Sequence, residues 1–277
     1  MRLYDAHNHL QDDRLATHLG AILPTLAPSG IARMVVNGSC EEDWPAVLAL
    51  AKREPRVLPS FGYHPWYVRE RTSDWQRELV RFLDAVPSAV GEIGLDKWIL
   101  DPGRSSTLNL KSPAPLSEQE EVFIWQLRLA AERNLPVSIH CLQAWGPLFD
   151  ILTREPRPNR GFVLHSYGGP REMVAPFAKL GAYFSLPGYF AHERKQRQRD
   201  AFLTVPPDRL LIETDAPDQL LPETRNRHPL IDAKTGKALN HPVNLVAVYQ
   251  FASELLGTTV ETLASLVEEN FLRIFSH

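Results

Sequence analysis

Eight short apolar segments alternate with longer amphipathic ones along the chain, and this alternation limits the possible folds more than any other feature. The short segments are nearly continuous in apolar and β-branched residues, which is typical of parallel strands buried on both faces. They are residues 3–6, 31–36, 57–61, 89–93, 137–139, 161–164, 182–185 and 210–213. Eight strands separated by helices predict an α/β fold of the (β/α)8 TIM barrel type.

Amphipathic patterns predict helices between these segments, for example over residues 43–53 and 118–134. Two further patterns, 243–256 and 260–275, follow the eighth segment, so we expect two additional C-terminal helices. A doubly wound open sheet is the competing architecture, but its first strand usually leads into a Gly-rich phosphate turn. Because the chain has no internal repeat and no Gly/Ser linker, we expect residues 1–277 to form a single domain.

Composition excludes several classes of protein. No apolar run approaches the roughly 20 residues that a membrane span needs. The N-terminus lacks the apolar core of a secretory signal, and the two cysteines, Cys40 and Cys141, fit a reducing compartment, so we expect a cytoplasmic protein. The net charge of −3 excludes wholesale electrostatic capture of nucleic acid, although a local site for a strand end stays open.

Side chains that can bind metal stand at or just beyond the ends of the strand segments. They are His7 and His9 at the first, Glu92 at the fourth, His140 at the fifth, His165 at the sixth and Asp215 after the eighth. Because side chains alternate along a strand, both imidazoles of the His7-x-His9 pair point to the same side, at the mouth of the barrel. Ionisable groups gathered there are costly to bury without a neutralising cation. The mixed set of His and carboxylate ligands suits Zn²⁺, Mn²⁺ or Fe²⁺, and less readily Mg²⁺.

Two connections are unusually long, residues 97–117 after the fourth segment and residues 216–242 after the eighth. Both leave the carboxyl ends of strands, which is the face where barrel enzymes hold their active sites. We therefore expect these loops to shape a substrate site.

Five motifs contain the six candidate ligands. They are His7-x-His9, Gly91-Glu92-Ile93-Gly94-Leu95-Asp96, Ser138-Ile139-His140, Val163-Leu164-His165-Ser166 and Glu213-Thr214-Asp215-Ala216-Pro217. Together they resemble the TatD-like metal-dependent hydrolases, barrel enzymes of the amidohydrolase superfamily, many of which are deoxyribonucleases. The turn Gly62-Tyr63-His64-Pro65 and the tail 270–275 are similar to further features of that family. The resemblance covers essentially the whole chain, in the family's order.

The resemblance implies a site for two divalent metal ions, with Zn, Mn and Mg as the candidates. His7, His9 and Asp215 would hold one ion, Glu92 would bridge the two, and His140 and His165 would hold the second. With a bridging hydroxide such a site carries a net charge of about +1, which attracts a phosphodiester, and its bound water has a pKa lowered towards about 7. Glu92 and Asp215 are then the candidate catalytic residues. Asp215 would act as general base, and pure metal ligation is its alternative role.

Several other residues have two interpretations each. His64, in the loop after the third segment, either contacts a substrate phosphate or hydrogen-bonds the backbone. Asp96 either orients a metal-binding histidine or caps the long loop. The run 192–199 carries four positive side chains, which could hold a nucleic-acid backbone, although such a run is usually a solvated helix face. Cys141 is typical of a small packing residue.

Three features depart from the family pattern. Leu142-Gln143-Ala144 replaces an Arg-Asp-Ala run, so an Arg suited to a phosphate is missing. Asn240-His241-Pro242 replaces Asn-Glu-Pro, and the loop 98–115 is longer than usual. These departures surround the six ligands without replacing any of them.

Three functional hypotheses follow. The favoured one is a divalent-metal-dependent deoxyribonuclease or phosphodiesterase that cleaves DNA from strand ends with a metal-activated water. The second, motivated by Leu142, is a hydrolase of a small ester, lactone or amide that uses the same two-metal site. The third is a barrel without catalytic activity that serves as a binding or scaffold protein, and the complete ligand set argues against it.

Overall fold

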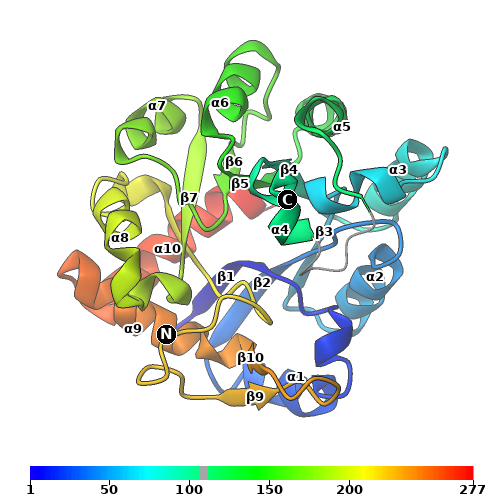
Figure 1. The fold of residues 1–277 in the computed structure, drawn as a ribbon. Helices are drawn as coiled ribbons and strands as arrows, with labels where there is room; N and C mark the ends of the chain where they lie inside the picture. Colours follow the sequence, from blue (N-terminus) through cyan, green and yellow to red (C-terminus); the bar gives the residue numbers. More distant parts are fainter. Residues whose placement is uncertain (106–111, 277) are drawn as a thin grey trace.

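A sheet of eight parallel strands in sequential order forms the centre of the computed structural model, which describes residues 1–105 and 112–276. The strands are β1 (Leu3–Asn8), β2 (Ile31–Asn37), β3 (Val57–Phe61), β4 (Ala89–Asp96), β5 (Val137–Leu142), β6 (Phe162–Leu164), β7 (Ala182–Pro187) and β8 (Leu210–Glu213). Figure 1 shows the strands around a common centre with the helices outside them. The predicted TIM barrel is confirmed.

Helices connect the strands and two of them follow β8. They are α1 (Leu19–Leu26), α2 (Trp44–Arg53), α3 (Trp75–Ala85), α4 (Pro102–Ser105), α5 (Leu116–Arg133), α6 (Trp145–Arg154), α7 (Val174–Lys179), α8 (Gln196–Phe202), α9 (Leu245–Leu256) and α10 (Val260–Phe275). The predicted bounds of α10 are confirmed. The helix begins there because the Thr259 hydroxyl accepts a hydrogen bond from the Thr262 amide and so caps the first turn. The predicted start of α9 is two residues early, since residues 242–244 form a 3₁₀ turn.

Five strands run further than the sequence predicts, β2 by one residue to Asn37 and β7 by two to Pro187. The other three carry candidate ligands. β1 continues to Asn8, β4 to Asp96 and β5 to Leu142, so His7, Glu92 and His140 lie inside strands and not at their ends. Polar side chains do not interrupt these strands, because their backbones stay paired while the side chains face the mouth. Gly94, opposite His140, allows this pairing: a Cβ there would lie 1.9 Å from the His140 carbonyl oxygen.

The seam between β1 and β8 is closed by side chains as well as by backbone. The Tyr249 hydroxyl of α9 accepts from the Tyr4 amide and donates to the Tyr4 carbonyl, and Asn270 of α10 donates to the Leu210 carbonyl. Nearer the mouth, the Asp215 amide donates to the His7 carbonyl oxygen at 2.9 Å. The two C-terminal helices therefore satisfy backbone polar groups of β1 and β8 that these two strands do not pair with each other.

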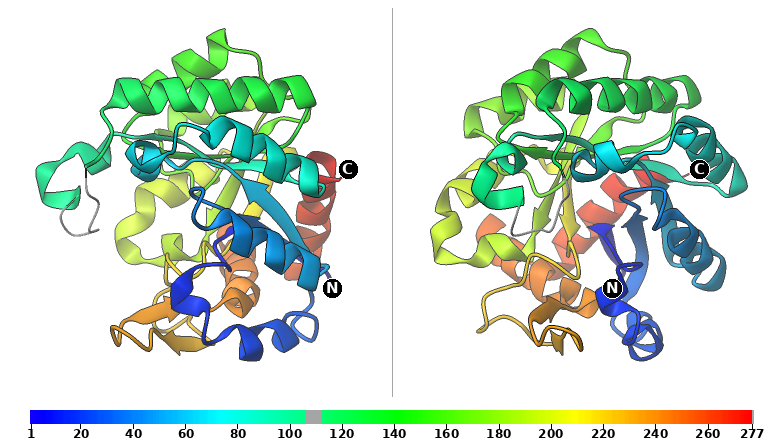
Figure 2. Two further views of the ribbon diagram at one scale, coloured as in Figure 1. Left: turned by 90° about the vertical axis from the view of Figure 1, so that its right-hand side faces the viewer. Right: turned by 45° about the vertical axis from the view of Figure 1, so that its right-hand side comes forward.

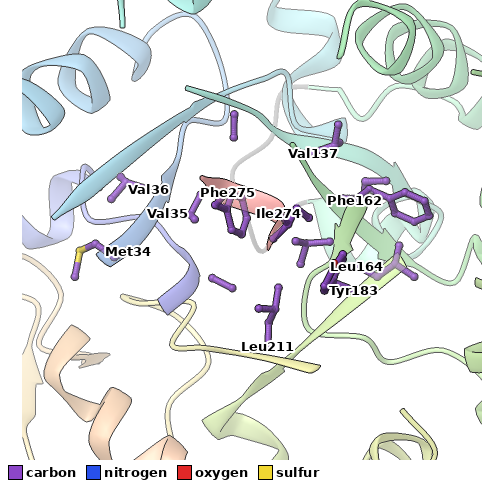
Figure 3. Close-up of a cluster of buried hydrophobic side chains, with 14 of the residues drawn as sticks. Met34, Val35, Val36, Val137, Phe162, Leu164, Tyr183, Leu211, Ile274 and Phe275 are labelled. Carbon is purple, nitrogen blue, oxygen red and sulfur yellow. The ribbon is translucent and has the colours of Figure 1, made fainter. Parts of the chain in front are cut away.

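The core lies inside the strands and extends to the last helix. Figure 3 shows Val36, Val137, Leu164 and Leu211 together with Phe275 of α10 in one cluster. All of these side chains are buried. Because α10 also packs on β1 and β8, the C-terminal helices are part of the barrel and not an appendage.

Both long connections contain secondary structure of their own. The segment after β4 includes α4, and Figure 2 shows it at the opposite end of the barrel from the two chain termini. Residues 106–111 of the predicted 97–117 loop lie outside the described part of the chain. The segment after β8 contains an unpredicted antiparallel pair, β9 (Pro229–Ile231) and β10 (Ala238–Asn240). Among the described residues, no helix is long and apolar enough to cross a membrane.

Candidate metal centre

The carboxylate of Glu92 lies at the centre of the ligand cluster, and its two oxygens face different groups of residues. Oε2 is 3.3 Å from His7 Nε2 and 3.2 Å from His9 Nε2. Asp215 Oδ1 is 3.7 and 3.6 Å from the same two nitrogens. We call His7, His9 and Asp215 the first ligand group.

The other oxygen of Glu92 faces imidazoles only. Oε1 is 3.0 Å from His140 Nδ1, 3.0 Å from His165 Nε2 and 3.4 Å from His64 Nε2. We call His140 and His165 the second ligand group. The stacked rings of His7 and His165, with centroids 3.9 Å apart, join the two groups. The structure thus brings all six predicted ligands together around one carboxylate.

Hydrogen bonds outside the cluster determine which ring nitrogen of each histidine is unprotonated and directs its lone pair into the cluster. His9 Nδ1 donates to the Asn37 carbonyl oxygen at 2.8 Å, so the Nε2 of a neutral His9 is an acceptor. His140 Nε2 lies 3.0 Å from Asp96 Oδ2, which leaves Nδ1 as an acceptor directed at Glu92. Acceptors that face acceptors in a buried site need a cation between them. This donor set therefore fits a metal ion.

The ring of His64 directs a protonated nitrogen into the cluster, in contrast to His9 and His140. Its Nδ1 accepts a hydrogen bond from the Trp66 amide at 3.2 Å, so the proton of the neutral ring is on Nε2, which faces Glu92. Although His64 lies close enough to join a metal cluster with Glu92 and His140, a protonated nitrogen has no lone pair for a metal. The geometry suits a hydrogen-bond donor to a substrate.

The pKa values of the cluster show how strongly its charges interact. Burial alone would lower the pKa of His9, but Glu92 and Asp215 raise it to about 10. Burial would likewise lower the pKa of His140, and Asp96 and Glu92 raise it to about 9. Burial raises the pKa of Asp215 to about 7. The pocket therefore holds positive charge around Glu92, as protons when no metal is bound.

Backbone strain is concentrated at this site. Four of the five residues other than glycine with positive φ in the described chain, Gln143, Ser166, Asp215 and Gln219, lie at or beside the cluster. Each such conformation costs of order 1–3 kcal/mol and persists only where surrounding contacts enforce it. At Asp215 (φ 52°), Gln219 Nε2 donates to Oδ2 at 2.6 Å and leaves Oδ1 to face the histidines.

The ligands lie in an open cavity of about 700 Å³ at the carboxyl ends of the strands. Its wall includes Trp66 and Tyr67 after β3, Cys141 and Leu142 of β5, and residues from the loops after β1, β2 and β8. The cavity thus lies at the face of the barrel where enzymes of this fold hold their active sites.

Sequence reasoning missed two buried carboxylates that support the cluster. Asp5 Oδ1 accepts from the Thr214 amide and Asp5 Oδ2 from the Thr214 hydroxyl, which joins β1 to the segment that carries Asp215. Glu213 accepts from the hydroxyls of Ser166 and Ser185 and has an oxygen 3.6 Å from His165 Nδ1. Both carboxylates stand beside a ligand motif, which was the available signal for them.

The residues with two interpretations are also placed. Asp96 both contacts a histidine of the cluster and caps the long loop. Its Oδ2 lies beside His140 Nε2, and its Oδ1 accepts a hydrogen bond from the Ile99 amide at the start of the loop. In the basic run, Arg199 donates to the Phe190 and His192 carbonyls, and Arg194 donates to the Tyr189 hydroxyl. None of the run's described residues lines the cavity.

The barrel and its convergent ligand set define a metal-dependent hydrolase of the TIM-barrel type. The chain belongs to the TatD-related DNase family, whose model matches residues 4–276. It is 30% identical to the uncharacterized metal-dependent hydrolase YabD of Bacillus subtilis, over 99% of this chain and 98% of that protein. It is 28% identical to the 3'-5' ssDNA/RNA exonuclease TatD of Escherichia coli K12, over 99% and 98%. The crystal structure of the TatD homologue YjjV from E. coli K12 superposes with a TM-score of 0.80 at 26% identity, over 100% of this chain and 98% of that one.

Proposed function

We propose that this protein is a divalent-metal-dependent nuclease that hydrolyses phosphodiester bonds at the ends of DNA strands. The observation that carries the proposal is the arrangement around Glu92, whose two oxygens each face a separate group of nitrogen ligands 3.0–3.3 Å away. Two such groups support two metal ions, with Zn, Mn and Mg as candidates. One carboxylate between two cations is suited to a substrate with negative charge.

The ligands divide into two roles. His7, His9 and Asp215 would hold one ion, His140 and His165 the other, and Glu92 would contact both. When bound, the ions would supply the positive charge that polarises a phosphoryl oxygen and acidifies a water. Asn37 and Asp96 keep His9 and His140 in the tautomers that face inward.

Two residues would act on the substrate itself. His64 Nε2–H would donate to a non-bridging phosphoryl oxygen of the scissile phosphodiester. Asp215 would accept the proton of the water that attacks phosphorus, while the bond from phosphorus to the leaving oxygen breaks and that oxygen takes up a proton.

The relatives suggest the polarity of attack. Because a relative of nearly equal length carries the name of a 3'-5' ssDNA/RNA exonuclease, we place the attacked bond next to the 3′ end of a single strand. The free thiols of Cys40 and Cys141 support a cytoplasmic location.

A second candidate function is hydrolysis of a small ester, lactone or amide. It is favoured by Leu142, which lines the cavity where the family pattern has an arginine. An apolar side chain there removes a phosphate contact and would suit an uncharged substrate.

The proposal is tested by comparing wild type with Glu92→Gln, each stripped of metal and reloaded with Mg²⁺, Mn²⁺ or Zn²⁺. End-labelled single- and double-stranded oligonucleotides and a panel of lactones and esters are the substrates. Glu269→Gln, an exposed position on α10, is the matched control. Shortening of oligonucleotides by wild type and the control alone supports a nuclease. Intact oligonucleotides with turnover of a lactone or ester would reject it in favour of the second candidate.

A further inference from the structure

The wall of the cavity is divided into an acidic half and an uncharged half. The acidic half is formed by the loops after β8, β1 and β2, which are neighbours around the barrel. It carries five carboxylates, those of Asp12, Asp13, Glu42, Asp43 and Asp218. The wall residues of the β3 and β5 regions, Trp66, Tyr67, Cys141 and Leu142, add no charge, and we call them the uncharged half.

One cationic side chain lies among the five carboxylates, and it is already paired with two of them. Arg14 is the sole Lys or Arg among the described residues of the wall. Its guanidinium contacts Asp12 at 2.8 Å and Asp218 at 2.7 Å, so it joins the β1 and β8 loops. Five carboxylates against one guanidinium leave an excess of four negative charges in this half.

Two glutamine side chains of the same half have carbonyl oxygens without hydrogen-bond partners among the described residues. Gln11 is 9% exposed and its Nε2 donates to the Asn37 carbonyl and to Asp43, which leaves Oε1 without a partner among the described residues. Gln219 is arranged in the same way: its Nε2 donates to Ser166 and Asp215, and its buried Oε1 has no partner in the described chain. Hydroxyl or amino groups satisfy such acceptors, whereas a phosphate, which presents acceptors, does not.

We propose that the acidic half of the cavity is a subsite for the terminal group of the strand, which it accepts as a free hydroxyl and rejects as a phosphate. The inference rests on the proposed nuclease function and adds to it a rule for which ends are cut. The metal centre receives the scissile phosphodiester, and the rest of the strand runs over the uncharged half, where Trp66 and Tyr67 offer faces for bases. With 3′-to-5′ attack, the rejected end is a 3′-phosphate.

Three dinucleotides with one phosphodiester each test this rule: dTpdT, its 5′-phosphorylated form and its 3′-phosphorylated form. We expect kcat/KM for the 3′-phosphorylated form to be about tenfold below that for dTpdT. The 5′-phosphorylated form should differ from dTpdT by less than about twofold, because its 5′-phosphate would lie about one Debye length from the acidic half. Raising the ionic strength from about 0.05 to 0.5 M should narrow the gap.

The variant for this test is the double substitution Asp13→Asn and Glu42→Gln. Both side chains are exposed, and neither carboxylate has an ion pair or hydrogen bond within the described residues, so the amides should leave the fold unchanged. We expect the tenfold gap to shrink to about threefold, because two of the repelling charges are gone. Glu269→Gln, which removes one carboxylate on the exposed face of α10, should keep the full gap.

Binding of the products gives a readout that does not depend on turnover. Calorimetry should show that thymidine 3′,5′-bisphosphate binds metal-loaded wild type more weakly than thymidine 5′-monophosphate, and that the double variant reduces the difference. Equal kcat/KM values for all three dinucleotides would overturn the subsite. So would an unchanged ratio of kcat/KM between dTpdT and its 3′-phosphorylated form in the double variant. Rejection of the 5′-phosphorylated form supports the subsite and contradicts the polarity. Absent turnover with selective binding retained overturns the nuclease function and leaves the subsite standing.

Discussion

The two oxygens of Glu92 face surroundings that differ in charge. The first ligand group adds a second carboxylate, that of Asp215, to two imidazoles, whereas the second group offers Oε1 only imidazoles. A divalent ion on the first side would therefore meet two anions, and one on the second side a single anion. The comparison teaches that the two sides of one carboxylate differ in charge, so two ions held there would be bound unequally, and we expect the first to bind more tightly.

The hydrogen bonds behind the two groups differ as well. Ser138 and Asn37 support the histidines of the first group through neutral oxygens at 2.8 Å. In the second group, His140 is supported by the ionised side chain of Asp96, whose pKa is lowered by contact with His140 despite burial. His165 Nδ1 has no hydrogen-bond partner among the described residues. The outer support of the second group therefore comes from carboxylates, that of Asp96 at hydrogen-bond distance and that of Glu213 at 3.6 Å from His165 Nδ1.

Glu92→Gln should have the largest effect, since it removes the anion that both groups share. We expect the loss of both ions and a fall in kcat of at least about a thousandfold, because several kcal/mol of charge stabilisation disappear. Metal content by mass spectrometry and single-turnover kinetics measure this. Retention of one tightly bound ion would show that Glu92 does not bridge.

Asp215→Asn and His165→Asn compare the two groups directly. We expect the first substitution to weaken one ion by about a hundredfold and the second to weaken the other ion by less, because only Asp215 contributes a full charge. Calorimetric titration of the stripped protein with Mn²⁺ resolves the two sites. Equal losses for the two variants would contradict the proposed inequality.

Asp96→Asn should weaken only the ion of the second group. The amide cannot hold the His140 tautomer as the carboxylate does, and losses of roughly 10- to 100-fold are typical for such outer contacts. We expect a value near tenfold, with the first ion unchanged. Glu118→Gln, at a surface ion pair with Arg69, is a control that should leave both affinities unchanged.

A smaller effect is expected from pH. Without metal, the pKa of Asp215 is about 7 and those of His140 and His9 about 9 and 10, so protons occupy the metal ligands below these values. Metal must displace these protons, and affinity should fall as pH falls from about 9 to 6, by up to tenfold per unit for each proton released. Calorimetry in buffers of different ionisation enthalpy counts the protons. Asp215→Asn should release one proton fewer below pH 7, and a pH-independent affinity would refute the assignment.

Much of the candidate site could be predicted from the sequence, because barrel enzymes carry their functional groups at the face where the strands end. The His7-x-His9 spacing directs both imidazoles to one side, and the order of the motifs assigns each candidate ligand to a barrel strand or to the residues just after one. The six ligands and the alternation of strands and helices follow from such local patterns. The length of β4 did not, because Gly94 and Asp96 resemble a turn when their strand partners are unknown.

Other features depend on contacts between residues far apart in the chain. Tyr249 lies 245 residues from Tyr4, and the Asp5 carboxylate meets Thr214 across 209 residues. Likewise, the protonated nitrogen of His64 is set by its local contact with Trp66, but its approach to Glu92 is set by the packing of β3 against β4.

The sequence by itself determined the type of fold, the six candidate ligands and the chemistry that such residues can support. Periodicity and residue type are local properties, and a strand carries them wherever it lies. Only the tertiary structure decided that the ligands divide unequally around Glu92, and that one half of the cavity is acidic. These properties depend on which loops become neighbours when the barrel closes, since charges act through space and not along the chain.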